Sequence, residues 1–212
     1  MRNRLIIVGA GGLGLIVYDV LKNDPLAQAD VALHGFLDTR EQLQLPPEID
    51  AQLLGDPRTY QPVDGDLFMP AVGDPRWRQD LVEPLAAKGA TFYQYTSRAA
   101  IGARTKIGRG VFLTPGAVIS TDCHIGDFAY VDTYVVVGHN VNIGAHCMVG
   151  AMTFLAGDVQ IGRGVAIHPR ATVAKGVRIG DGATIGIGSV VVKDVPAGAT
   201  VFGNPARPIY VP

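Results

Sequence analysis

A glycine-rich loop near the start of the sequence, Gly9-Ala10-Gly11-Gly12-Leu13-Gly14, could bind a phosphate. It follows an apolar run, Arg4–Val8, and opens a helix-like segment, Leu13–Lys22, which is the context that a G-x-G-x-x-G phosphate loop requires. Bare backbone N–H groups at the start of a helix attract anions. Asp38 ends the next expected strand, where a contact to a ribose or base is expected. The pattern predicts a nucleotide site; alternatively, the glycines only allow strand and helix to pack closely.

Five histidines offer a second kind of chemistry, because imidazole exchanges a proton near neutral pH and can act as a general base. Four have structural interpretations as strand, wall or turn residues: His34, His124, His146 and His168. Four of the five, His124, His139, His146 and His168, have neither the ligand spacing of a three-histidine zinc site nor a shared column of the repeat described below. Such a zinc site is therefore disfavoured, and no metal is expected. Cys123 and Cys147 fall at inward positions of that repeat, which favours core packing over nucleophilic chemistry.

Composition narrows the class of protein. The 212 residues carry 18 Lys and Arg against 19 Asp and Glu, a net charge of −1, so no basic excess is present to bind nucleic acid. The longest apolar stretches, such as Leu5–Ala10 and Leu13–Tyr18, are too short to cross a bilayer, and no signal peptide is expected. Two cysteines imply no disulfide framework, which favours the cytoplasm.

The first part of the chain alternates between strand-like and helix-like segments, which predicts a small parallel α/β sheet. The expected strands are Arg4–Val8, Ala32–Asp38, Asp66–Val72 and Ala90–Tyr95, and the expected helices are Leu13–Lys22 and Pro75–Lys88. A polar stretch runs from Thr39 to Asp64. About 95 residues provide only one half of a doubly wound dinucleotide domain. A mononucleotide is therefore favoured over NAD, and a dehydrogenase is disfavoured.

A hexad repeat occupies the rest of the chain. Sixteen aliphatic residues recur every six positions, from Ile101 to Val191, and a small residue stands four positions after each. Six residues do not return a helix to one face, so the repeat is not helical. The pattern instead predicts a solenoid in which three hexads form a triangular coil of eighteen residues, with coils stacked about 4.8 Å apart.

The fourth place of each hexad holds residues that tolerate a left-handed backbone and therefore predicts the turns. These residues are Gly110, Gly116, Asp122, Asn140, Asp158, Gly164, Gly176, Gly182, Gly188 and Asp194.

The uninterrupted [Ile/Leu/Val]-Gly-x-x-small-x hexads resemble the left-handed parallel β-helix of hexapeptide-repeat acyltransferases. The tail from Val201 to Pro208 resembles that family's closing motif. Together with the glycine-rich first part, nearly the whole chain resembles the NeuD/PglD-like sugar O- and N-acyltransferases. The resemblance implies a Rossmann-like α/β half domain over residues 1–97 that binds a nucleotide sugar. It also implies a β-helix over residues 98–212 that uses acetyl-CoA.

The resemblance also implies roles for single residues. His139, in Val136-Val137-Gly138-His139-Asn140, stands where the family has its catalytic base. Family contacts to the nucleotide sugar fall on Gly11, Gly12, Leu13, Asp38 and Gly73, and contacts to acetyl-CoA fall on Met148 and Gly157. The family often has His at the places of Leu13 and Met148.

Asn140 departs from the family, which usually has Asp or Glu after the catalytic histidine. An amide oxygen can orient the imidazole ring but cannot stabilise imidazolium as a charge. One coil is eighteen residues, so Asp122 and Asp158 stack on either side of Asn140. We expect one of these two, Asp122 before Asp158, to supply the missing negative charge; alternatively, the three are only a column of turn residues.

The expected activity is acetyl transfer from acetyl-CoA to a nucleotide-activated amino sugar, at its 4-amino group, with His139 as general base. The resemblance further implies a homotrimer with sites between subunits. Two alternatives remain open: O-acetylation of a sialic acid or another sugar, and a non-catalytic trimeric scaffold that binds a nucleotide sugar.

Overall fold

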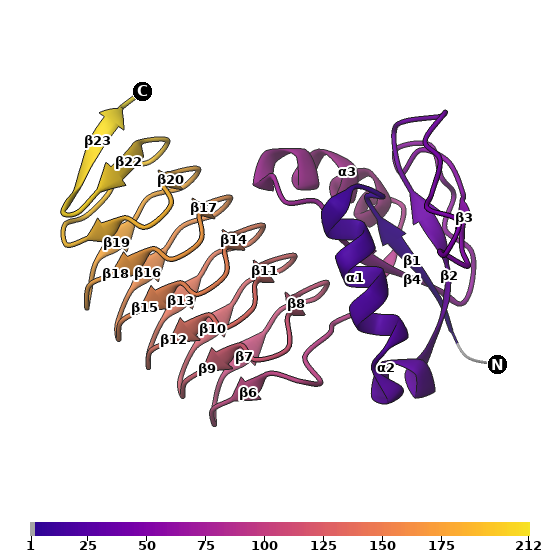
Figure 1. The fold of residues 1–212 in the computed structure, drawn as a ribbon, viewed down its shortest axis with the longest axis horizontal. Helices are drawn as coiled ribbons and strands as arrows, with labels where there is room; N and C mark the ends of the chain where they lie inside the picture. The colour runs from indigo at the N-terminus through magenta and orange to yellow at the C-terminus, as the bar shows by residue number, and fades with distance from the viewer. Residues whose placement is uncertain (1–2) are drawn as a thin grey trace. The chain divides into compact units, whose positions relative to one another are not determined.

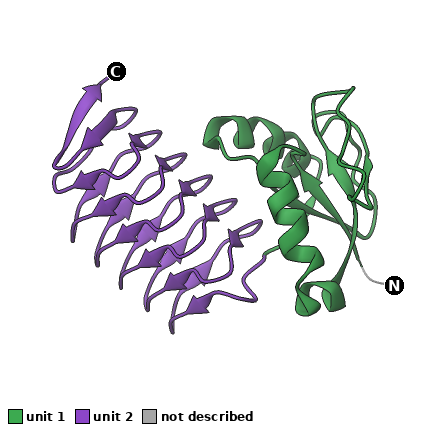
Figure 2. Ribbon diagram, viewed as in Figure 1, with its two compact units in different colours: residues 1–94 green, residues 95–212 purple. Residues whose placement is uncertain are grey.

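The computed structural model describes residues 3–212, and the chain divides into two compact units, Met1–Gln94 and Tyr95–Pro212 (Figure 2). The boundary precedes the expected one at 97/98 because Tyr95 already belongs to the repeat. Its N–H donates to the Val111 carbonyl at 2.9 Å. Its ring stacks on Phe112 with the ring centroids 4.6 Å apart.

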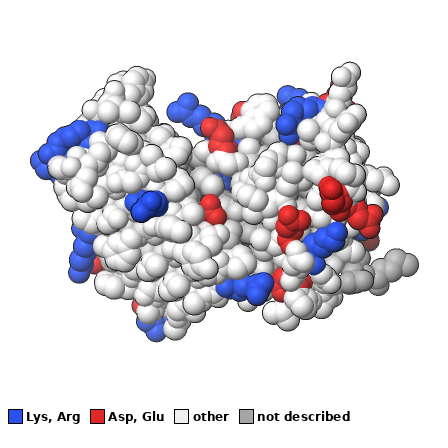
Figure 3. Space-filling view, viewed as in Figure 1, with Lys and Arg blue, Asp and Glu red and all other residues white. Residues whose placement is uncertain are grey.

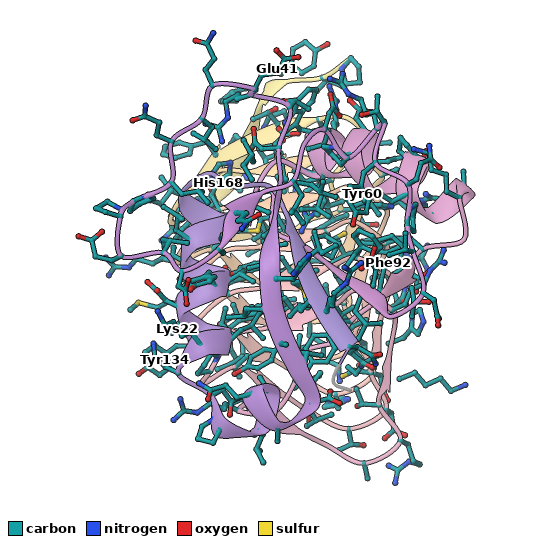
Figure 4. All side chains as sticks on the ribbon, turned by 90° about the vertical axis from the view of Figure 1, so that its right-hand side faces the viewer. Lys22, Glu41, Tyr60, Phe92, Tyr134 and His168 are labelled. Carbon is teal, nitrogen blue, oxygen red and sulfur yellow. The ribbon has the colours of Figure 1, made fainter. Side chains whose placement is uncertain are left out.

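Unit 1 is built on a parallel sheet with the strand order β3-β2-β1-β4-β5 (Figure 1). The strands are β1 (Asn3–Val8), β2 (Val31–Leu37), β3 (Gln52–Leu53), β4 (Asp66–Pro70) and β5 (Thr91–Phe92). Leu5–Val8 of the central strand are buried, as the apolar run predicts. Phe68 packs in the core between Tyr60 and Phe92, both labelled in Figure 4, with ring centroids 5.9 and 6.1 Å away. The predicted α/β sheet is confirmed, whereas β3, inside the polar stretch, was not predicted.

Three helices are found among residues 3–212: α1 (Gly12–Lys22), α2 (Pro25–Asp30) and α3 (Pro75–Ala87). Asp24 and Asp74 cap the last two by accepting hydrogen bonds from the N–H groups of Leu26 and Trp77. In α1, by contrast, the N-cap is Gly11, which has no side chain to cap the helix, and the first turn from Gly12 contains no acidic residue. Helix α2 was not predicted, although an Asp-Pro pair marks its start.

Unit 2 is a left-handed parallel β-helix of short strands, which form three sheets (Figure 1). We name each sheet after the residues that lead its strands. The polar face comprises β7 (Lys106–Ile107), β10 (His124–Ile125), β13 (Asn142–Ile143), β16 (Gln160–Ile161) and β19 (Arg178–Ile179). The apolar face comprises β6 (Ala100–Ile101), β9 (Val118–Ile119), β12 (Val136–Val137), β15 (Phe154–Leu155), β18 (Thr172–Val173) and β21 (Val190–Val191).

The third sheet is the aromatic face. It comprises β8 (Phe112–Leu113), β11 (Tyr130–Val131), β14 (Met148–Val149), β17 (Ala166–Ile167), β20 (Thr184–Ile185), β22 (Thr200–Gly203) and β23 (Ala206–Tyr210). The rings of Phe112 and Tyr130 stack on it with centroids 5.5 Å apart. On the side of the molecule drawn in Figure 3, charges of both signs are interspersed over unit 1, while much of the surface of unit 2 is uncharged.

The predicted eighteen-residue coil is confirmed, since Ile125 pairs with Ile107 on one side and with Ile143 on the other. The aliphatic hexad residues from Leu113 to Val191 are buried, as are the small residues four positions later from Val111 to Val195. Both sets form one continuous core inside the triangle. Ile101 is 40% exposed because it belongs to the first coil, at the end of the stack.

The predicted turns adopt positive φ at nine of the ten expected positions, among them Asp122 (61°), Asn140 (58°) and Asp158 (65°). The expectation for Asp194 is wrong. Val195 bridges to Ile179 and Val201 pairs with Ile185, so the last coil is shorter than eighteen residues and its turn moves to Gly198 (φ 68°). Larger residues also adopt a left-handed backbone at turns: Arg104, Phe128, Tyr134, His146, Met152 and Arg170.

Candidate active site

The glycine loop lies where the carboxyl ends of β1, β2 and β4 meet. A cavity of about 420 Å³ opens there and is lined by residues that follow each of these strands and by the first part of α3. Carboxyl ends of parallel strands at a change in strand order are where open α/β sheets bind ligands. All five residues expected to contact the nucleotide sugar line this cavity: Gly11, Gly12, Leu13, Asp38 and Gly73.

The glycines of the loop divide into two kinds. A Cβ atom on Gly14 would lie 2.0 Å from the Gly9 carbonyl oxygen, and one on Gly9 would lie 2.7 Å from the Val72 side chain. These two glycines are therefore required for close packing of strand and helix. A Cβ on Gly12 would meet nothing within 4 Å, and one on Gly11 would only approach Arg40 at 3.7 Å. Packing alone does not explain Gly11 and Gly12, whose missing side chains leave the start of α1 open to the cavity.

Asp38 is almost fully occupied by other protein groups. Its carboxylate accepts hydrogen bonds from the Ala10 N–H at 2.9 Å and from the backbone and guanidinium of Arg40 at 2.8 to 3.0 Å. Burial alone would raise the pKa of this carboxyl, but the hydrogen bonds from Arg40 and Ala10 outweigh it and lower the pKa to about 2. Asp38 thus anchors the glycine loop and Arg40, rather than offering a free carboxylate to a ribose.

Two lining residues were not singled out from the sequence. The Arg40 side chain is 55% exposed beside Gly11, and Trp77, in the first turn of α3, is 45% exposed. A guanidinium binds phosphate or a base edge, and an indole ring stacks on a base or a sugar. The sequence did contain signals for both: Arg40 follows β2 in an Asp-Thr-Arg sequence, and Trp77, the single tryptophan of the chain, stands four residues after Gly73. Across the cavity, Leu13 approaches Gly73, where a Cβ would lie 4.0 Å from the leucine side chain.

His139 stands in the turn between β12 and β13, at the corner of the apolar and polar faces, and its side chain is 53% exposed. Gly157, expected to contact acetyl-CoA, lies directly against the ring. A Cβ on Gly157 would be 2.6 Å from the His139 Nε2 atom, so the glycine makes room for the imidazole. The coil after His139 also holds its backbone, since the Asp158 N–H donates to the His139 carbonyl at 2.9 Å.

Asn140 contacts the ring, as expected, but through the other end of its amide. The Asn140 Nδ2 atom lies 3.1 Å from His139 Nδ1 and also donates to Asp158 Oδ1 at 3.0 Å. The direct distance from His139 Nδ1 to Asp158 Oδ1 is 3.9 Å. Hydrogen bonds from Asn140 and from Lys175 Nζ, 3.3 Å away, hold the pKa of the Asp158 carboxyl below its ordinary value.

The expectation that Asp122 would be the partner of His139 is not supported by this geometry. Arg104 binds both oxygens of Asp122 at 2.6 Å, and Thr121 donates to it as well. These hydrogen bonds lower the pKa of Asp122 to about 2. The eighteen-residue coil places Asp122 and Asp158 symmetrically on either side of Asn140. The difference is that Arg104, one coil before Asp122, pairs with the Asp122 carboxylate.

Met148, the other residue expected to contact acetyl-CoA, lies on β14 of the aromatic face, between Tyr130 and Ala166. It therefore belongs to a different sheet from the strands that flank His139. The two cysteines are buried, as predicted, and their sulfurs donate to the carbonyls of Gly138 and Gly162. His168, labelled in Figure 4, is exposed, whereas His146 is buried against Phe128.

Over residues 3–212, His, Cys, Asp and Glu side chains do not gather in a group of three or more that could hold a metal ion. In the same residues, the helices are too short or too polar to cross a membrane.

Comparisons with known families match both units. Residues 4–85 match the family model of the PglD N-terminal domain. Residues 122–157 and 158–193 match the model of the bacterial transferase hexapeptide, which describes six repeats. Comparison with curated protein sequences gives no significant match.

Solved structures of three other proteins are similar to this chain over nearly its whole length. The acetyltransferase domain of PglB from Neisseria gonorrhoeae, in complex with acetyl coenzyme A, is 27% identical with a TM-score of 0.86, covering 99% of this chain and 100% of that one. A variant of GDP-perosamine N-acetyltransferase from Caulobacter crescentus, in complex with CoA and GDP-perosamine, is 26% identical with a TM-score of 0.88, covering 100% and 99%. WeeI from Acinetobacter baumannii is 26% identical with a TM-score of 0.86, covering 97% and 99%.

The similarity extends over both units in the same order along the chain. A PglD-type first unit with a glycine-loop cavity is followed by a hexapeptide β-helix with an exposed histidine at one corner. The chain is therefore a member of the NeuD/PglD-like family of hexapeptide-repeat sugar acyltransferases.

Proposed function

We propose that this protein transfers an acetyl group from acetyl-CoA to the amino group of a nucleotide-activated amino sugar, with His139 as the general base. The observation that carries the proposal is the setting of His139. An exposed imidazole stands at a β-helix corner with Gly157 clearing space at Nε2 and polar groups at Nδ1. PglB and GDP-perosamine N-acetyltransferase, which bind acetyl-CoA or CoA, share this fold over their whole length.

The cavity of unit 1 is assigned to the nucleotide. The open N-terminus of α1 at Gly11 and Gly12 attracts the diphosphate. Arg40 adds a positive charge beside it, and Trp77 offers a flat surface for a base or sugar ring. Asp38 acts indirectly in this assignment, because it holds both Arg40 and the Ala10 end of the loop.

Acetyl transfer to an amine requires one proton acceptor. A bond forms between the sugar nitrogen and the thioester carbonyl carbon, and the bond from that carbon to the CoA sulfur breaks. The nitrogen must lose a proton as it attacks, and His139 takes that proton and returns it to the departing thiolate or to water. A positioned general base contributes about 10²- to 10⁴-fold to such a reaction.

We also propose that the active form is a homotrimer. The apolar face supports this assignment, because Val118, Val136 and Phe154 project from neighbouring strands and are 43%, 39% and 46% exposed. A row of exposed apolar side chains on a flat parallel sheet indicates a protein interface. Replacing Phe154 and Val136 by Glu should give monomers in sedimentation velocity, and trimers that survive both changes would contradict the assignment.

We infer that the reaction takes place in the cytoplasm, because Cys123 and Cys147 are not joined in a disulfide in the described part of the chain.

The test measures release of CoA thiol from acetyl-CoA in the presence of UDP-, dTDP- and GDP-linked 4-amino sugars. We expect turnover with one of them and a loss of at least 100-fold in His139→Ala, with unchanged far-UV circular dichroism and melting temperature. Undiminished turnover in that variant would refute the assignment of the base. If no amino sugar reacts but acetyl-CoA binds, the acceptor is a hydroxyl, as in O-acetylation of a sialic acid. If acetyl-CoA does not bind, the protein is a scaffold.

A further inference from the structure

The Asn140 amide lies between the catalytic imidazole and a carboxylate. Its Nδ2 atom is within hydrogen-bonding distance of His139 Nδ1 and of Asp158 Oδ1. A carboxylate at neutral pH only accepts hydrogen bonds, so the end of the amide that faces Asp158 is its NH₂ group. The two hydrogens of that group serve the two neighbours, one directed at Asp158 and the other at the imidazole.

This arrangement fixes the position of the ring proton. Because the amide donates to Nδ1, Nδ1 accepts and the neutral ring carries its hydrogen on Nε2. A ring in that form has no lone pair at Nε2, which is the nitrogen beside Gly157. To accept a proton at Nε2, His139 must carry its other proton on Nδ1, and that proton needs an acceptor. The Asn140 NH₂ group cannot provide one.

Asp158 has the geometry to be that acceptor. Its Oδ1 lies 3.9 Å from Nδ1, so a shift of the ring by about an ångström brings the two into hydrogen-bonding range. Its other oxygen is held by Lys175 at 3.3 Å, and its N–H is bound to the His139 carbonyl. The backbone of Asp158 is thus held against the backbone of the histidine, and its carboxylate is held by Lys175.

We propose that Asp158, one coil after the histidine, is the positioning residue that accepts a hydrogen bond from the Nδ1–H of His139 during acetyl transfer. In this chain the carboxylate stands eighteen residues along the sequence from Asn140, rather than beside the histidine. Asn140 holds the resting ring in the Nε2–H form. The exposed ring then gains a proton at Nδ1 from water and loses the one at Nε2 to water, and the new Nδ1–H turns to Asp158. The inference rests on the proposed role of His139 as base, and it assigns the group that determines which ring nitrogen carries the proton.

Other charged groups face His139 from both neighbouring coils. On the preceding side, Asp122 is neutralised by Arg104, and on the following side Asp158 is shared with Lys175. Asp122 is thus a matched control for Asp158. It has the same charge, occupies the same turn position and lies on the opposite side of Asn140, but its carboxylate is paired with Arg104. Only Asp158 is linked to the ring through the Asn140 amide in the described part of the chain.

The first experiment reads the ring directly and needs no sugar substrate. Nitrogen-15 NMR of the histidine side chains in the full-length protein, with the His139 signal assigned by its loss in His139→Ala, reports tautomer and titration. We expect the Nε2–H form in the wild type and the Nδ1–H form in Asn140→Asp. Removing a negative charge destabilises imidazolium, so in Asp158→Asn the midpoint of the titration should fall by about half a unit to one unit. Asp122→Asn should shift it by less than half as much.

The second experiment follows turnover with the sugar that reacts in the thiol assay. Asp158→Asn should lower kcat about tenfold with little change in KM, and should move the acidic limb of the pH–rate profile to lower pH. Adding Asn140→Asp to that variant should restore most of the rate. A wild-type profile in Asp158→Asn, or an equal effect of Asp122→Asn, would overturn the proposal. Turnover in His139→Ala would instead refute the role of the base, while the NMR titration would still report on Asp158.

Discussion

The glycine loop of unit 1 and the histidine corner of unit 2 are built in opposite ways. In the loop, two residues adjacent in sequence contribute by lacking side chains, since Gly11 and Gly12 leave the start of α1 bare. At the corner, side chains eighteen residues apart are brought together by stacking, and Asn140 and Asp158 meet beside one ring. Binding at the glycine loop should therefore be changed by atoms added to the glycines. The properties of the histidine corner should instead depend on which of the stacked carboxylates already has a positively charged partner.

The largest effect is expected from adding one methyl group to the part of the loop that packs. Gly14→Ala places a Cβ 2.0 Å from the Gly9 carbonyl oxygen, which is backbone and cannot swing away. We expect a loss of unfolding free energy of about 3 kcal/mol in unit 1, measured by urea denaturation.

The matched control is Gly12→Ala, where the new atom meets nothing within 4 Å. Because alanine is a better helix former, stability should be unchanged or higher by about 0.5 kcal/mol. Binding of UDP, dTDP or GDP, measured by calorimetry, should weaken about tenfold, since the methyl group covers the start of the helix. Equal losses of stability in both variants would remove the distinction between packing and binding glycines.

The next effect tests whether the corner also depends on an absent side chain. In Gly157→Ala the Cβ would lie 2.6 Å from His139 Nε2. The ring is exposed and can rotate away, so the melting temperature should change little. The base then leaves its position, and kcat should fall about 100-fold because positioning dominates proton transfer. A variant with full activity would show that the ring does not work from the position seen here.

The smallest effect concerns the acid stability of unit 1. The folded pKa of Asp38, about 2, lies below the ordinary value of 3.8, so ionised Asp38 stabilises the fold above about pH 4. That contribution, about 2 kcal/mol, is lost as pH falls from 4 towards 2. We expect Asp38→Asn to be less stable than the wild type by this amount at pH 7 and equally stable at pH 2, in urea titrations at both pH values. A constant difference would contradict the assigned pKa.

Much of the fold was predictable because each hexad repeats one physical rule. Leu113 and Val111 are buried because every coil needs an aliphatic residue inside and a small one at the corner. The expected turn is absent at Asp194, because the last coil is shorter than eighteen residues. The hexad pattern itself does not indicate this shorter coil. Helix α2 and strand β3 were missed because they are too short to show a period.

The positions of the site residues were predictable from the sequence, but the ion pairs that these residues form were not. The sequence places Asp122 and Asp158 symmetrically around Asn140, and the difference arises from Arg104, which pairs with one of them. Likewise Asp38 was expected to meet the ligand, but Arg40, two residues later, occupies its carboxylate. Competition among neighbouring charges is a property of three-dimensional geometry, which spacing along the chain does not encode.

The hairpin of β22 and β23 forms the last edge of the aromatic face. Every coil offers its successor a parallel row of N–H and carbonyl groups, so a stack of this kind is also a template onto which foreign strands could add without limit. On the aromatic face the final strand, β23, runs antiparallel to β22, and Pro208, opposite Val201, has no N–H to donate. A further parallel strand from another molecule finds the wrong direction and a missing donor on that edge. Which strands can add to this edge is therefore determined by the tail strand, Ala206–Tyr210, and not by the hexads themselves.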